Sequence, residues 1–269
     1  NSKNLNSEST SNGSFINQQS LDSNLDILYS NYSSGTNILI RRYSGIKPGQ
    51  TLETTDFGDL LFTNRPTALE VSPFTTTSTT LIVGTVLGDV LKVENADSLP
   101  IFTNIETDNV IVGSVSDVQF GATENDIFVT VHNYGVENIW YTSDGGITWA
   151  GKEGDLPDLP VKAILQNPFN LDEVIIGTEL GIWFTSDFSS ASPDWEPAQG
   201  GMSNVRVTDI DLRDDNAIYI STYGRGVFSG QFLEDPDADN DGDGIPNISD
   251  NCLNTSNSDQ ADIDGNGIG

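Results

Sequence analysis

The feature that most constrains this chain is a repeated three-strand unit. Each copy has an apolar run, a second apolar run that ends in Gly-Thr or a similar pair, a turn that contains glycine, and a third run. Equivalent positions in four copies are separated by steps of 49, 43 and 45 residues: Leu91, Trp140, Trp183 and Phe228. A period of about 40 to 50 residues made of short strands is typical of the blades of a β-propeller.

The region of repeats has the pattern of an all-β protein. Short apolar runs separated by Gly, Asn, Asp, Thr and Ser extend to about Phe232, and no stretch has a helical period. A weaker fifth copy lies at residues 25–41, so about five blades are expected, alone or as part of a larger propeller. The last copy has no clear fourth strand, which either the segment near Phe15 or further blades would supply. A β-sandwich is the alternative, but it does not explain why Gly-Thr, Gly and Trp recur at matching places.

The charge of the chain excludes two classes of partner. It has 11 basic and 40 acidic residues, a net charge of −29. Such a surface repels phosphate backbones and anionic lipid, so we expect no nucleic-acid partner. No apolar run approaches the roughly 20 residues that span a bilayer, so we expect no membrane insertion. The same excess of carboxylates suits divalent cations.

Composition divides the chain into three parts. Residues 1–12 are polar and predict a flexible lead-in, residues 13–232 hold the propeller repeats, and residues 233–269 form an acidic tail. Arg225 is the last basic residue, whereas ten acidic residues follow from Glu234 onward. The boundary near residue 232 is therefore the clearest one in the sequence.

One turn inside the repeat carries a recognisable motif. The segment Thr-Ser-Asp-Gly-Gly-Ile-Thr-Trp resembles the Asp-box of BNR-type propellers, a group that includes sialidases, sortilin-type receptors and xyloglucanases. Its defining positions are Thr142, Asp144, Gly146, Thr148 and Trp149. The aspartate is expected to accept backbone N–H bonds, the glycine to take a conformation barred to other residues, and the tryptophan to pack between blades. The motif thus predicts a structural turn in a calcium-free propeller. A degenerate copy at residues 185–190 lacks the glycine and has its tryptophan late, at Trp195.

The tail contains the strongest chemical signal. A twelve-position calcium loop beginning at Asp239 would place oxygens at alternate positions, with a sharp turn at Gly244 and a backbone carbonyl from Ile245. The side-chain ligands expected in this loop are Asp239, Asp241, Asp243, Asn247 and Asp250. Pro246 and the absence of flanking helical patterns exclude an EF-hand frame. The alternative is a solvated acidic linker that binds Ca²⁺ only loosely.

This loop resembles thrombospondin type 3 repeats, which share the Asp-Gly-Asp-Gly-Ile-Pro core and the following Asp-Asn-Cys. The resemblance implies a second repeat, whose first ligands are Asp262, Asp264 and Asn266. It also implies that Cys252 pairs with a cysteine of a neighbouring repeat. Weak calcium sites fill only where calcium is plentiful, so the protein is expected outside the cell or on its surface. Similar layouts occur in Bacteroidetes substrates of type IX secretion, which implies the secretion machinery or an outer-membrane anchor as partner.

Three interpretations of function remain open. A non-enzymatic module for adhesion or display would bind a glycan or a surface protein, with Tyr134 and Tyr223 as candidates for stacking on sugars. The alternative is an extracellular glycoside hydrolase, either sialidase-like or xyloglucanase-like, with Asp209 and Asp211 facing the central channel. The six arginines lack the sequence setting of a sialidase, and His132 has no triad partner in a recognisable motif. In the third interpretation, the chain is cargo of the export machinery, and its own role is unrelated to export.

Overall fold

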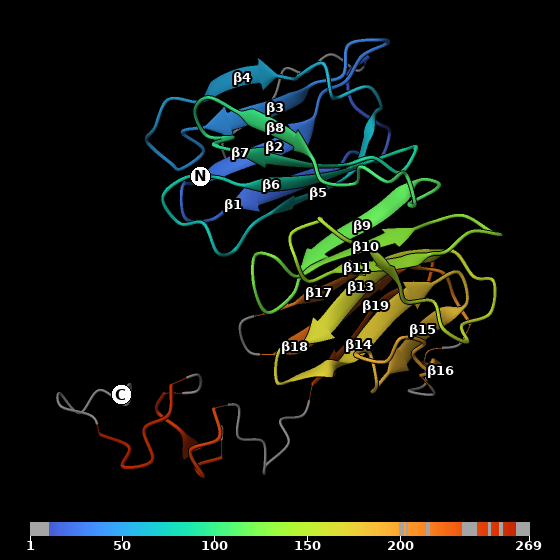
Figure 1. Ribbon diagram of the computed structural model, residues 1–269. Coiled ribbons are helices and arrows are strands. Elements are labelled where there is room, and N and C mark those ends of the chain that lie inside the picture. The colour runs from blue at the N-terminus through green and yellow to red at the C-terminus, as the bar shows by residue number, and fades with distance from the viewer. Residues whose placement is uncertain are drawn as a thin grey trace.

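The computed structural model describes residues 11–198, 202, 204–213, 216–232, 241–246, 249–252 and 255–261. Within these ranges there is no α-helix, and 19 strands form five antiparallel sheets (Figure 1). Each sheet is one blade, and the chain passes through the blades in order. The expected all-β class and the five-bladed propeller are therefore confirmed.

Blades 1 to 3 have four strands each, which run outward from the first strand. Blade 1 consists of β1 (Gln19–Asp22), β2 (Ile27–Asn31), β3 (Ile40–Ser44) and β4 (Glu53–Phe57). Blade 2 consists of β5 (Pro66–Val71), β6 (Leu81–Thr85), β7 (Val90–Glu94) and β8 (Ile101–Asn104). Blade 3 consists of β9 (Val115–Phe120), β10 (Ile127–Val131), β11 (Ile139–Thr142) and β12 (Ala150–Gly151).

Blades 4 and 5 differ in their number of described strands. Blade 4 consists of β13 (Val161–Asn167), β14 (Asn170–Thr178), β15 (Gly181–Thr185) and β16 (Glu196–Pro197). Blade 5 consists of β17 (Val207–Leu212), β18 (Ala217–Thr222) and β19 (Gly226–Gln231), and its sheet has three strands in the described part of the chain. Phe15 is fully exposed and lies outside any strand, so the expectation that its neighbourhood completes this blade is wrong.

The hydrophobic core lies between the blades. Four clusters of buried side chains each join two consecutive blades, and the first strands contact one another in chain order from β1 to β17. Every residue of β6 and β10 is buried, because a blade covers each face of these strands. Their side chains, such as Ile127, Phe128 and Val129, are therefore apolar on both faces rather than alternating.

The repeated Gly-Thr pair has a packing reason. A Cβ atom at Gly84 in β6 would lie 2.2 Å from Cγ1 of Val115, the first residue of the next blade. A Cβ atom at Gly177 in β14 of blade 4 would lie 2.5 Å from Cγ1 of Val207, the first residue of blade 5. Glycine at these two places lets the first strand of the following blade approach the backbone closely.

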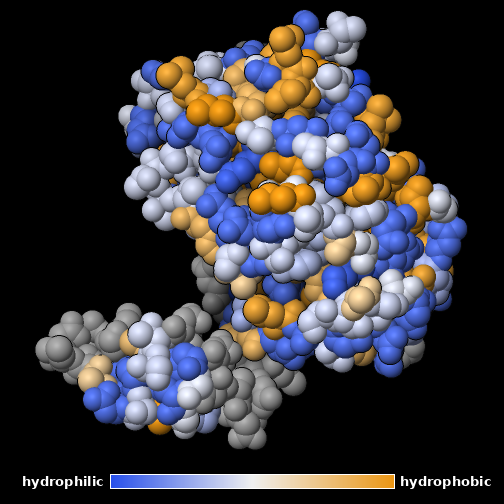
Figure 2. Space-filling model, in the orientation of Figure 1, coloured by the Kyte–Doolittle hydropathy of each residue, from blue (hydrophilic) through white to orange (hydrophobic). Residues whose placement is uncertain are grey.

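The visible surface of the propeller is mixed in polarity. Figure 2 shows hydrophobic side chains scattered among hydrophilic ones instead of one continuous apolar face. No segment among the described residues forms a helix long and apolar enough to cross a membrane.

Candidate functional site

A cavity of about 400 Å³ lies at the axis of the propeller. It takes lining residues from the first strand of every blade: Gln19, Glu70, Asp117, Lys162 and Asp209. In blades 2 to 5 the pairing of the first strand with the second skips one residue, which forms a β-bulge at its start. All four skipped residues line the cavity: Thr67, Ser116, Lys162 and Thr208. Since a bulge re-aims side chains, this irregularity explains how consecutive polar residues reach the axis.

The axial cavity concentrates carboxyl groups. The pKa of Glu70 is raised to about 8, chiefly by loss of hydration on burial and then by the negative charges of Asp117, Asp211 and Asp209, in that order of effect. Burial also raises the pKa of Asp117 to about 6, although the backbone N–H of Ile164 donates to its Oδ2 at 3.0 Å. At neutral pH the cavity therefore combines a protonated Glu70 with an ionised Asp117.

The sequence pattern indicates half of this carboxyl cluster. Asp209 and Asp211 line the cavity, as expected from their place on an inner strand. Glu70 and Asp117 were not predicted, because the sequence does not show where the bulge lies and therefore which way the side chain of an acidic residue on an apolar strand points. The matching Ser-Asp of β9 and Thr-Asp of β17 was the available signal, since both pairs follow a valine that begins a first strand.

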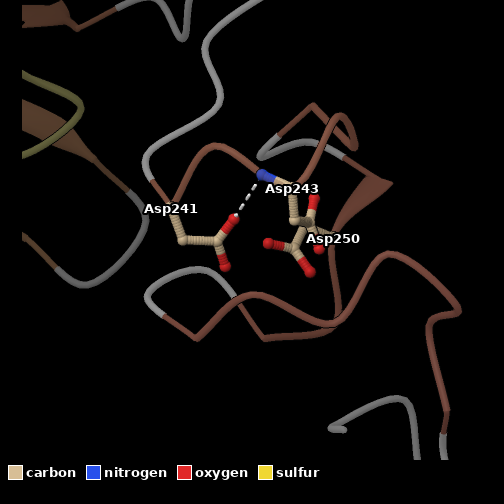
Figure 3. Close-up of side chains that lie close together, drawn as sticks. All are labelled: Asp241, Asp243 and Asp250. Atoms are coloured by element: carbon tan, nitrogen blue, oxygen red, sulfur yellow. Dashed lines mark hydrogen bonds between the residues drawn. The ribbon is translucent and has the colours of Figure 1, made fainter.

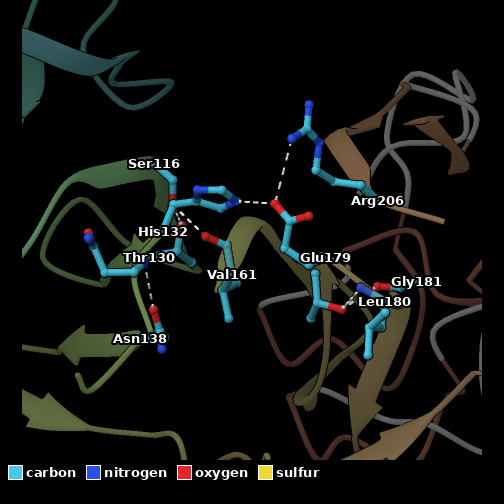
Figure 4. Close-up of polar contacts among 11 residues, drawn as sticks. Ser116, Thr130, His132, Asn138, Val161, Glu179, Leu180, Gly181 and Arg206 are labelled. Atoms are coloured by element: carbon cyan, nitrogen blue, oxygen red, sulfur yellow. Dashed lines mark hydrogen bonds and ion pairs between the residues drawn. The ribbon is translucent and has the colours of Figure 1, made fainter. Parts of the chain in front are cut away.

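The single histidine joins three blades through polar contacts. Its Nε2 lies 2.8 Å from Oε1 of Glu179, and Nη1 of Arg206 lies 3.8 Å from the same oxygen (Figure 4). The guanidinium of Arg206 stacks over the ring of Tyr223 at 4.4 Å. Burial, followed by the charge of Lys162, lowers the pKa of His132.

The two tyrosines predicted to stack on sugars lie at the surface. Tyr223 and Tyr134 keep 70% and 65% of their surface exposed, so both are accessible to a ligand.

The Asp-box residues form one hydrogen-bonded turn between β11 and β12. Asp144 accepts the backbone N–H of Thr148 at 2.9 Å and its hydroxyl at 2.7 Å, and these bonds hold the pKa of Asp144 down at about 2. The hydroxyl of Thr142 accepts the N–H of Gly146, whose φ is 94°. The indole N–H of Trp149 donates to the carbonyl oxygen of Ile105 in the preceding blade at 2.8 Å.

The tail brings three of the predicted calcium ligands together. One carboxylate oxygen each from Asp241, Asp243 and Asp250 lies within 4.8 Å of the other two (Figure 3). The turn has Gly244 at φ 90°, and Oδ2 of Asp250 is buried and accepts no hydrogen bond from the described residues.

Other contacts close this part of the tail on itself. The N–H of Asn257 donates to Oδ2 of Asp243 at 2.8 Å, and the amide of Gln260 donates to Oδ1 of Asp250 at 2.9 Å. Ile245 donates its N–H to Oδ1 of Asp243, and the thiol of Cys252 is free. The remaining predicted ligands lie outside the described residues: Asp239, Asn247, Asp262, Asp264 and Asn266.

The architecture defines the chain as a β-propeller protein. It is similar in structure to the GH74 glycoside hydrolase of Niastella koreensis, with a TM-score of 0.53 and 16% sequence identity. The alignment covers 79% of this chain and 35% of that enzyme, so the chain spans about a third of its length. No family model matches the sequence, and no curated protein matches it either. At this identity the likeness shows the fold alone.

Proposed function

We propose that this chain is a non-enzymatic, extracellular or cell-surface propeller that binds a glycan or a surface protein in adhesion or display, carried on a calcium-stabilised tail. The observation that carries the proposal is the convergence of Asp241, Asp243 and Asp250 around a glycine turn. Carboxylate oxygens are the ligands that Ca²⁺ prefers, and a bound ion offsets their mutual repulsion. Asp250 offers a buried oxygen that accepts no hydrogen bond from the described residues, as a ligand position would.

The compartment follows from the metal. Sites of this kind in extracellular modules have affinities of roughly 10⁻⁴ to 10⁻³ M, so they fill only where calcium is abundant. A net charge of −29 also suits a soluble surface-displayed protein. The tail then acts as a stalk toward the secretion machinery or an outer-membrane anchor of the type IX pathway, and the propeller presents the binding face.

Calorimetry and proteolysis test the calcium tail. Titration of the whole chain with CaCl₂ is expected to show binding, and Ca²⁺ is expected to protect residues 241–261 from protease relative to a chelator. Asp241→Asn should weaken binding at least tenfold, whereas Asp108→Asn, an exposed acid of the propeller, should leave it unchanged. Absence of binding in millimolar CaCl₂ would remove the tail from the proposal.

A glycan array tests the propeller. The whole chain is expected to bind immobilised glycans without hydrolysing them. Failure to bind any glycan, combined with failure to bind cell-surface proteins, would overturn the binding function even if the tail binds calcium.

A second candidate function is glycoside hydrolysis, and the axial carboxyl cluster favours it. Glycosidases need one protonated and one ionised carboxyl group on either side of the scissile bond, and a pKa of about 8 keeps Glu70 protonated at neutral pH in a cavity that Asp211 also lines. The GH74 neighbour fits this candidate. Turnover of xyloglucan that is abolished by Glu70→Gln and by Asp211→Asn would establish the enzyme. Binding without turnover would reject it.

A further inference from the structure

A second cavity, of about 390 Å³, lies between blades 3 and 4 and is separate from the axis. Blade 3 contributes Tyr141 from β11 and Asp126 from the turn before β10. Blade 4 contributes Gln166, Asp172 and Phe188. The volume falls within the range of small-molecule sites, which are concave and combine aromatic walls with a few placed polar groups.

The aromatic wall is rigid. The rings of Tyr141 and Phe188 meet edge to face, with centroids 5.5 Å apart and an interplanar angle of 86°. Phe128 packs on both, at 4.9 Å and 5.2 Å. The hydroxyl of Tyr141 donates to Oδ1 of Asp126 at 2.7 Å, which fixes the exposed edge of the ring. A ligand would therefore meet a preformed surface, which lowers the entropy cost of binding.

A buried ammonium group forms another side of the cavity. Lys152 is only 7% exposed, and its Nζ donates to the carbonyl oxygens of Phe188 at 2.9 Å and Ser190 at 2.6 Å. An ammonium group has three N–H donors, so one N–H of Lys152 has no hydrogen-bond acceptor within residues 11–198, and Nζ lies over the ring of Phe188 at 5.2 Å from its centroid. A lysine is rarely buried this deeply, and the two carbonyls account for only part of its hydrogen-bonding capacity.

The cavity also offers acceptors. Asp172 uses Oδ1 to accept the N–H of Ser189 at 2.7 Å, which leaves Oδ2 for a ligand. The side-chain Nε2–H of Gln166 donates to the carbonyl oxygen of Leu171 at 2.7 Å, so its Oε1 points away from that carbonyl. One donor cation, two carboxylates and one amide oxygen are thus spaced around an aromatic wall.

From this arrangement we infer that the cavity binds a single neutral pyranose unit of a polysaccharide. Apolar C–H groups of the sugar ring would pack on Tyr141, which the buried ring of Phe188 supports, and its hydroxyl groups would donate to Asp172 and Gln166 and accept from Lys152. Anionic sugars are disfavoured, because Asp126 and Asp172 outnumber the one ammonium group. The inference rests on the proposed glycan-binding function, for which it names the site and the class of ligand.

Nuclear magnetic resonance of the whole chain tests the inference. Methyl glycosides of glucose, galactose, xylose and N-acetylglucosamine are the probes. Addition of a bound glycoside is expected to shift the side-chain amide signal of Gln166 and the backbone amide signal of Ser189. Asp172→Ala and Gln166→Ala should each weaken binding at least tenfold. Glu196→Gln, an exposed acid of the same blade, should leave the affinity unchanged.

Three outcomes would overturn the inference. One is that none of the four glycosides shifts either amide signal, a result that does not depend on the folding of a variant. Another is equal affinity in wild type and both variants, and a third is stronger binding of a uronic acid than of its neutral parent sugar. If the glycan array is positive while these signals stay unchanged, the site fails and the proposed function stands. A negative array rejects this site, and a negative array combined with failure to bind cell-surface proteins rejects the proposed function itself.

Discussion

The indole Nε1 of Trp149 donates to the carbonyl oxygen of Ile105 across the boundary between blades 3 and 2, at 2.8 Å. One blade further on, Nε1 of Trp195 donates to the carbonyl oxygen of Lys152 at 3.0 Å. Both acceptors directly follow the fourth strand of the preceding blade, β8 for Ile105 and β12 for Lys152. The degenerate Asp-box therefore keeps the same inter-blade bond, although it lost the glycine and moved its tryptophan.

Replacement of either tryptophan by phenylalanine tests this bond. Trp149→Phe and Trp195→Phe each leave a carbonyl without its donor, and we expect a loss of about 1–3 kcal/mol in the free energy of unfolding. Trp183→Phe is the matched control, because Nε1 of Trp183 is buried without a hydrogen-bond partner in the described residues. Urea denaturation followed by circular dichroism measures the three variants. A loss for Trp183→Phe as large as for the other two would contradict the role of the bond.

The close approach of β9 and β17 to the preceding blades gives a second prediction. Gly84→Ala and Gly177→Ala place a methyl group 2.2 Å and 2.5 Å from valine side chains, so each should lower the free energy of unfolding by about 1–3 kcal/mol. Gly230→Ala in β19 meets nothing within 4 Å and should change it by no more than about 0.5 kcal/mol. Thermal unfolding of the three variants is the measurement. Equal stability of all three would show that the blades adjust to the added methyl groups.

These glycines also show what the sequence could and could not reveal. The repeat made the blades predictable, because each blade needs the same apolar strands, and blades 2 and 4 carry the same Gly-Thr pair where the next blade packs on them. The side-chain direction of Glu70 and of Asp117 was not predictable, since a bulge at the start of each strand decides which side chains face the axis of the propeller. The cavity between blades 3 and 4 was likewise hidden, because its walls are far apart in sequence: Asp126, Lys152 and Phe188.

The Asp-box turn has a pH dependence of its own. Hydrogen bonds from Thr148 keep the pKa of Asp144 at about 2, below the value of about 3.9 for a free aspartate. Because this pKa is lower in the folded protein, the unfolded chain takes up the proton at a higher pH than the folded chain does as the pH falls. The contribution of Asp144 to stability is therefore present above about pH 4 and is lost as the pH falls to 2. Thr148→Ala should raise this pKa, and NMR titration of the Asp144 side chain would detect it. A pKa near 3.9 in the wild type would rule out the proposed bonds.

Glu70 predicts the opposite trend at the axis. The pKa of Glu70 is about 8 in the folded protein, whereas that of a free glutamate is about 4.3. Between about pH 4.3 and about pH 8, the folded protein therefore keeps a proton on Glu70 that the unfolded chain has lost. Stability therefore falls as the pH rises from about 4.5 to 8. Glu70→Gln keeps the neutral, hydrogen-bonding shape at every pH, and we expect it to flatten this part of the stability profile. Asp108→Asn, an exposed acid of the propeller, should leave the slope unchanged. The measurement compares the denaturation midpoints of the three proteins at intervals from pH 4 to 9. A wild-type midpoint that does not change with pH would show that Glu70 ionises freely and cannot serve as a proton donor.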